Sequence, residues 1–129
     1  MIDPKIDLRP FIPSIEVKKQ TSQEERFQNK VIRPIIKLQH ELIIAYFKHF
    51  IDQKKIVLND FCDQKITEFI SKLFKTNASL KTNLKGLIIG MFTIAEFNVY
   101  LTMSSQLNKR ITSILEARVI SVYLTHQNI

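Results

Sequence analysis

Residues 21 to 54 read TSQEERFQNKVIRPIIKLQHELIIAYFKHFIDQK, and this segment determines how the rest of the chain must pack. Its apolar residues recur at spacings of three and four, which is the period of one face of an α-helix. Thr21 and Glu24 have the spacing of a capping box, in which each side chain accepts a hydrogen bond from the other residue's backbone N–H. We therefore predict a long helix from Thr21 to about Lys54.

Pro34 lies inside this helix, where it removes one backbone hydrogen bond and crowds the preceding turn. A kink near residues 30–34, or a new helix beginning there, is therefore expected. The apolar arc of the segment is wide, so it should contact more than one neighbouring helix.

The composition favours one helical domain. The chain has 129 residues and is 45% apolar, which suits a single core. It contains two glycines and four prolines, so it has few turns to offer and must be built from long elements. We find no apolar run of the length that spans a membrane and no apolar core of a signal peptide, and we expect a cytoplasmic protein without a membrane partner.

Three further helices are predicted from capping residues and periodicity. They cover residues 59–74, residues 76–90 with Gly90 as the stop, and residues 93–125, which begin with a second capping box at Thr93 and Glu96. Short connections make neighbouring helices antiparallel. The prediction is an all-α, antiparallel four-helix bundle with two long and two short helices over residues 21–129, preceded by an extended N-terminal arm over residues 1–20.

The cysteine, the glycines and the histidines each lead to a separate prediction. Cys62, the single cysteine, shares a helical face with Ile66 and is expected to be buried and inert. Gly86 and Gly90 lie four residues apart, a spacing that would let another backbone approach closely. The three histidines do not cluster in the sequence, so no metal site is predicted, and nothing in the chain points to a cofactor.

A set of polar residues interrupts the apolar arcs and forms the candidate site. Gln28, Gln39 and Tyr46 align in a narrow sector of the first helix, and Glu25 points near the same side. In an antiparallel bundle Arg118 of the last helix would reach this sector, and Glu25 is its predicted partner. The cluster is either a structural network that fixes the register of the two long helices or a binding pocket for a small anion or carbonyl compound. No catalytic residue is assigned.

Arg33 and His40 share a helical face two turns apart. Their spacing is similar to the Arg-x(4–6)-His motif of the helical ribonuclease domains of toxin systems. Pro34, directly after the arginine, departs from that pattern.

A broader resemblance covers about residues 8 to 120. The segments 24–29, 33–39 and 84–93, followed by Glu96 and Tyr100, resemble a group of small uncharacterised all-helical bacterial proteins. Some members of that group are catalogued as glyoxalase. The glyoxalase fold is built from paired βαβββ units with metal ligands on strands. This sequence predicts no such strands. The resemblance therefore implies a helical fold and leaves the activity open.

Charge and surface pattern define the expected function classes. The net charge is +7, but the lysines and arginines are scattered, with no run longer than two. Because the apolar arcs and the apolar arm call for extra contact surface, we expect a non-catalytic protein-interaction or assembly module that forms a homodimer. The alternatives are a small-ligand-binding protein or enzyme that uses the Glu/Gln/Arg cluster, and a nucleic-acid-binding protein that uses the basic surface.

Overall fold

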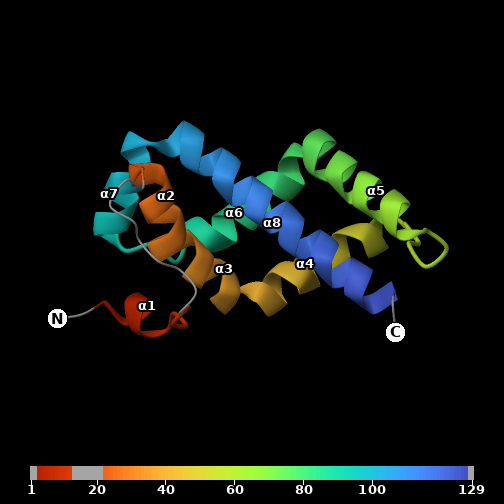
Figure 1. Ribbon diagram of the computed structural model, residues 1–129, viewed down its shortest axis with the longest axis horizontal. Coiled ribbons are helices and arrows are strands. Elements are labelled where there is room, and N and C mark those ends of the chain that lie inside the picture. The colour runs from red at the N-terminus through yellow and green to blue at the C-terminus, as the bar shows by residue number, and fades with distance from the viewer. Residues whose placement is uncertain (1–2, 13–21, 128–129) are drawn as a thin grey trace.

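The computed structural model describes residues 3–12 and 22–127, and this part of the chain is helical without any strand (Figure 1). The elements are α1 (Pro4–Asp7), α2 (Gln23–Phe27), the π-helix η1 (Gln28–Ile32), α3 (Arg33–Leu38), α4 (His40–Gln53), α5 (Asp63–Thr76), α6 (Ala78–Ile89), α7 (Ile94–Thr102) and α8 (Ser104–Gln127). The all-α prediction is confirmed. Within the described ranges, no helix combines the length and the apolar content that crossing a bilayer would need.

The elements α2, η1, α3 and α4 follow one another as a single bent rod (Figure 1). Its N-terminal cap is Ser22, whose hydroxyl accepts a hydrogen bond from the backbone N–H of Glu25 at 3.2 Å. The cap therefore lies one residue later than the Thr21–Glu24 box predicts, and Thr21 is outside the described residues. The rod begins and ends close to the predicted bounds, as the apolar periodicity of the sequence indicates.

The irregularity expected near residues 30–34 is present as a π-turn. The backbone N–H of Arg33 donates to the carbonyl of Gln28, five residues earlier, instead of four. In a regular α-helix the ring of Pro34 would collide with the carbonyl of Lys30. The wider turn accommodates the proline without interrupting the rod.

The second and third predicted helices continue each other. Asn77 is the single residue between α5 and α6, and its extended backbone (φ −111°, ψ 92°) bends the chain without reversing it. Both helices run from right to left in Figure 1, and α8 returns from left to right. The chain thus makes three long passes, α2–α4, α5–α6 and α8, which differs from the predicted up-down-up-down bundle.

Side-chain pairs give the direction of the first and third passes. Gln28 contacts Arg110, and Phe47 packs edge to face on Tyr123 with ring centroids 5.5 Å apart. The residue numbers rise together along both passes, so α2–α4 and α8 run parallel. The prediction that they run in opposite directions is therefore wrong.

The middle pass runs against the first. Gln39 of the first pass contacts Leu87, whereas Tyr46, about two turns further on, contacts Asn83. Phe47 stacks on Phe74 with centroids 6.2 Å apart. Residue numbers fall along the middle pass as they rise along the first.

The core lies between the three passes. Leu107, Ile111, Leu115 and Val119, spaced by four residues, are fully buried on one face of α8, which packs on η1, α5 and α6. The facing side chains of the other passes are also fully buried: Ile32, Ile35, Ile36, Ile43, Phe47, Ile66, Ile70, Leu80, Leu84 and Ile88. The wide apolar arc of the first pass contacts two neighbours, as its width predicts.

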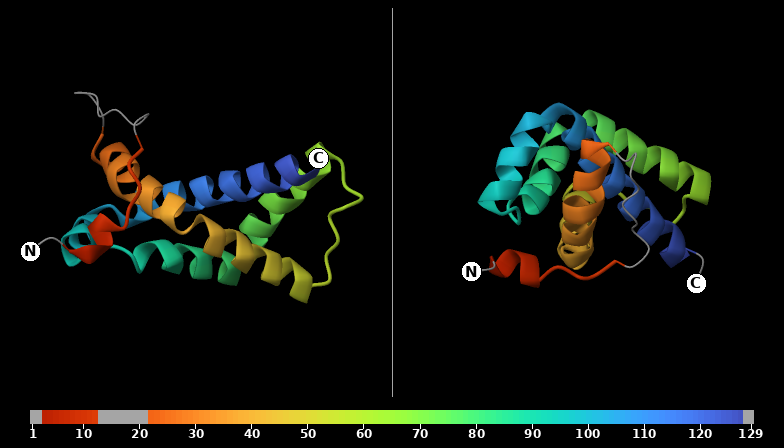
Figure 2. Two further views of the ribbon diagram at one scale, coloured as in Figure 1. Left: turned by 90° about the horizontal axis from the view of Figure 1, so that it is seen from below. Right: turned by 60° about the vertical axis from the view of Figure 1, so that its left-hand side comes forward.

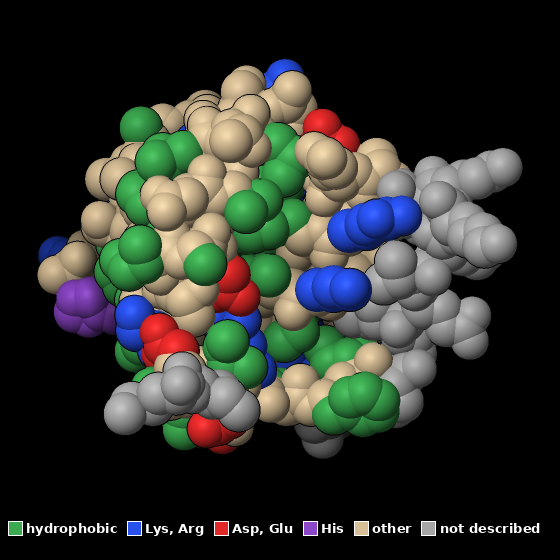
Figure 3. Space-filling view, turned by 90° about the vertical axis from the view of Figure 1, so that its left-hand side faces the viewer, with side chains coloured by type: hydrophobic (Ala, Val, Ile, Leu, Met, Phe, Trp, Pro, Cys, Tyr) green, Lys and Arg blue, Asp and Glu red, His purple; other side chains and the backbone are tan. Residues whose placement is uncertain are grey.

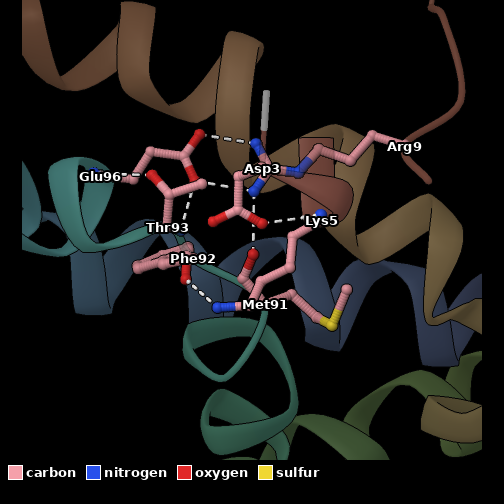
Figure 4. Close-up of polar contacts among 7 residues, drawn as sticks. All are labelled: Asp3, Lys5, Arg9, Met91, Phe92, Thr93 and Glu96. Atoms are coloured by element: carbon pink, nitrogen blue, oxygen red, sulfur yellow. Dashed lines mark hydrogen bonds and ion pairs between the residues drawn. The ribbon is translucent and has the colours of Figure 1, made fainter. Parts of the chain in front are cut away.

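The described part of the N-terminal arm lies on its own chain, against the turn between α6 and α7 (Figures 2 and 4). Lys5 Nζ donates to the carbonyl of Phe92 at 3.2 Å, and Arg9 Nη2 donates to the carbonyl of Met91 at 2.9 Å. The arm contains the helical turn α1, so it is not extended throughout. Residues 13–20 of the predicted arm lie outside the described residues.

Cys62 is exposed, so the prediction that it is buried is wrong. Helix α5 begins at Asp63 and not at residue 59, and Cys62 holds the N-cap position in extended backbone. A residue at that position precedes the first helical turn and does not share the apolar face of the turns that follow.

Candidate functional sites

Arg118 contacts His40 and not the predicted Glu25. Nη1 of Arg118, on α8, lies 3.0 Å from Nδ1 of His40, the first residue of α4. An arginine N–H can only donate, so Nδ1 of His40 is the acceptor and the ring proton resides on Nε2. Glu25 is exposed in α2, near the start of the first pass. Because α8 runs parallel to the first pass, Arg118 lies beside the middle of that pass.

Arg118 and His40 line a pocket of about 560 Å³ that opens between the first pass and α8. Arg33, one residue before Pro34, is the third basic side chain in its wall. The pKa of Arg118 is lowered, first because the guanidinium is partly buried and second because the charge of Arg33 is close. None of the described residues that line the pocket is acidic.

The other predicted site residues contact two different helices, α8 in the case of Gln28 and α6 in the case of Gln39 and Tyr46. The amide oxygen of Gln28 accepts from Nη1 of Arg110 at 2.8 Å, which ties η1 to α8. The amide of Gln39 donates to the carbonyl of Leu87 at 3.2 Å, in the last turn of α6, where carbonyls lack helical donors. The hydroxyl of Tyr46 accepts from the Asn83 amide at 2.6 Å.

These contacts do not form one cluster. Gln28, Gln39 and Tyr46 each join the first pass to a neighbouring helix through a separate hydrogen bond. These three residues therefore help to hold the passes together, as hydrogen-bonded polar groups inside a bundle do.

The ion pair of Arg9 with Glu96 links the N-terminal segment to α7 (Figure 4). Both terminal nitrogens of the guanidinium take part, with Nη1–Oε2 and Nη2–Oε1 distances of 2.6 and 2.7 Å. Glu96 also completes the capping box with Thr93 that the sequence predicts. Burial alone would raise the pKa of Glu96, but the hydrogen bonds from Arg9 and Thr93, together with the charge of Arg9, outweigh it and lower that pKa.

Helix α7 exposes apolar side chains on the face opposite the core. Ile94, Phe97 and Leu101, spaced by three and four residues, form one stripe and are 76%, 38% and 54% exposed. Tyr100 faces the core, where its hydroxyl donates to Asn108 at 2.6 Å. Helix α7 thus has apolar side chains on its outer side as well as on the side that faces the core.

A groove of about 580 Å³ lies beside this stripe, between α2–η1 and α7. Its apolar walls are Phe27 and Val31 on one side and Val99 and Met103 on the other. The stripe and the groove lie on different faces of the same helix, since Asn98, Val99, Thr102 and Met103 line the groove and the residues of the stripe do not.

No protein-family model matches the chain, and no curated protein and no solved structure is significantly similar to it. In residues 3–12 and 22–127, no group of three or more His, Cys, Asp or Glu side chains is placed to hold a metal ion.

Two features of the sites could not be read from the sequence. Arg9 stands among prolines with no helical pattern, so nothing in its surroundings indicated an ion pair with a residue 87 positions away. His40 as the partner of Arg118 requires the parallel order of the passes. The shared face of Arg33 and His40 was the one available signal for the basic pocket.

Proposed function

We propose that this chain is a protein-interaction module that forms a homodimer through helix α7. The observation that carries this proposal is the stripe of Ile94, Phe97 and Leu101, which a nine-residue helix directs into water. An exposed apolar stripe on a helix that also lines a groove is typical of association sites, because covering it removes apolar area from water.

The stripe belongs to a helix that is held firmly in place. The Thr93–Glu96 capping box fixes the first turn of α7, and Arg9 binds Glu96 from outside. Tyr100 anchors the inner face through its hydrogen bond to Asn108 and its ring contact with Phe92 at 5.6 Å. A rigid apolar face loses little conformational entropy on association, which favours specific binding over loose contact.

Self-association is favoured because α7 carries two complementary parts. The stripe projects from the helix, and Val99 of the same helix forms a wall of the groove. In a two-fold dimer the stripe of each copy can face the groove of the other, since both contacts are then made twice. Figure 3 views the end of the molecule that carries α7, and hydrophobic side chains are spread over this face.

Sedimentation velocity across a wide range of protein concentrations tests this proposal. We expect a reversible monomer–dimer equilibrium that Leu101→Glu and Ile94→Glu each weaken by at least about tenfold, equivalent to 1.4 kcal/mol. The matched control is Val57→Glu, which changes a side chain that is 62% exposed but lies between α4 and α5. It should leave the equilibrium unchanged.

A protein that stays monomeric at millimolar concentration would overturn the proposal. So would a dimer that Val57→Glu weakens as much as Leu101→Glu does, because the contact would then not be specific to α7. Circular dichroism of each variant checks that a lost dimer does not reflect a lost fold.

A further inference from the structure

The pocket between the first pass and α8 gathers positive charge. Arg33 and Arg118 approach closely enough for the charge of Arg33 to lower the pKa of Arg118, and no acidic side chain among the described residues lines the pocket to offset them. Two guanidinium groups in the wall of one pocket repel each other, and an anion bound beside both of them offsets that repulsion. The unbalanced charge therefore points to an anionic ligand.

His40 adds a neutral donor to this pair of charges. Its Nδ1 accepts from Arg118, which leaves the Nε2–H to donate from a ring that lines the same pocket. Ser113 contributes a hydroxyl to the wall. A fork-shaped guanidinium binds two oxygens of one group, so the set offers more donors than a single carboxylate can accept.

The pocket is larger than a single small ion requires. Its volume of about 560 Å³ falls in the range of pockets that hold small organic ligands. Ile114 and Val122 of α8 give it an apolar wall beside the basic side chains. A ligand that fits both parts has a charged group with several oxygen acceptors and an apolar body.

We propose that this pocket binds the phosphate group of a small organic phosphomonoester, with Arg33, Arg118 and His40 as donors and Ile114 and Val122 against the organic part. A phosphate monoester carries up to two negative charges and three terminal acceptor oxygens, which match two guanidinium groups and one imidazole N–H. The pocket contains no residue of α7, so this inference is independent of the proposed dimer.

Binding of phenyl phosphate, followed by isothermal titration calorimetry and by NMR in phosphate-free buffer, tests the inference. We expect one site per chain, with shifted resonances confined to α3, α4 and α8. Arg33→Met and Arg118→Met should each weaken binding by at least about tenfold. Arg118→Lys should weaken it by less, because the charge remains while the two-pronged geometry is lost.

Lys37→Met is the matched control, since Lys37 is an exposed cation on the same helix as Arg33 and does not line the pocket. It should change the affinity by less than about twofold. Equal losses in Lys37→Met and Arg33→Met would overturn the inference, because the attraction would then come from the overall positive charge. Arg33 is exposed, so its variant tests the site even if Arg118→Met unfolds.

Three further probes separate the ligand classes. Benzoate binding more tightly than phenyl phosphate would overturn the choice of phosphate. Inorganic phosphate binding as tightly as phenyl phosphate would overturn the role given to the apolar wall. A single-stranded RNA oligonucleotide that binds more tightly than phenyl phosphate at physiological salt, and that Arg33→Met releases, would replace a small ligand with a polyanion.

Discussion

Phe47 and Tyr123 pack edge to face at 5.5 Å, late in two long helical passes that run in the same direction. Phe47 is fully buried and also stacks on Phe74 of the middle pass, so one ring touches both neighbours of the first pass. The three aromatic rings therefore join all three passes at one level of the core.

Phe47→Ala should lower the free energy of unfolding by about 3–5 kcal/mol, because it removes a large side chain from a core that cannot fully collapse around the gap. Urea unfolding followed by circular dichroism measures this change. Leu42→Ala, on the same helix but 49% exposed, is the control and should cost less than about 1 kcal/mol.

A double-mutant cycle on Phe47 and Tyr123 tests the parallel arrangement. The two substitutions Phe47→Leu and Tyr123→Leu should be coupled by about 0.5–1.5 kcal/mol, as expected for aromatic side chains in direct contact. A coupling energy near zero would mean that the rings are not neighbours and that the two passes do not align in this way.

Arg9→Met should destabilise the fold by about 1–3 kcal/mol, because it leaves the carboxylate of Glu96 without its charged partner. The side chains of Arg9 and Glu96 are only 7% and 17% exposed, so water replaces the lost hydrogen bonds poorly. Lys48→Met, at an exposed position of α4, is the control. If both variants unfold at the same urea concentration, the ion pair contributes nothing measurable.

The contribution of Glu96 should depend on pH in a defined direction. Its pKa in the folded protein is lower than the ordinary value of 4.5, so folding favours the ionised carboxylate. The stabilisation is fully present above pH 4.5 and is lost as the pH falls through the folded-state pKa. The difference in unfolding free energy between the natural chain and Glu96→Gln should therefore narrow below pH 4.5. A difference that stays constant into strong acid would contradict this assignment.

Gly86 within α6 and Gly90 at its C-terminal cap should respond to alanine in different ways. A Cβ at Gly86 meets no heavy atom within 4 Å, so Gly86→Ala should raise the unfolding free energy by about 0.5–1 kcal/mol through its higher helix propensity. A Cβ at Gly90 would lie 3.0 Å from the carbonyl oxygen of Gly86, and Gly90→Ala should give no such gain. Thermal unfolding of the two variants makes the comparison.

The same glycines show what local pattern can predict. Gly90 ends α6 as predicted, but the open space at Gly86 shows that the prediction of a close backbone approach there is wrong. Helix starts and stops depend on neighbouring residues, and Thr93 with Glu96 was therefore identifiable as a capping box. Pro34 likewise marked the position of the π-turn, because proline disturbs the turn before it wherever it occurs.

The order of the passes was not predictable in this way. Asn77 ends α5 and begins α6, and its sequence signals are the same whether the second helix folds back or continues forward. One misjudged reversal inverts the direction of every later helix relative to the first. That single error moved Arg118 from His40, which it contacts, to Glu25 in the prediction.

The docking of α1 beside Glu96 determines where a fusion tag can be attached. A tag placed before Asp3 would emerge next to α7, whereas a tag placed after Gln127 would leave from the opposite end of the molecule (Figure 1). Labels intended for measurements of self-association therefore belong after α8, where their bulk stays clear of the surface being measured.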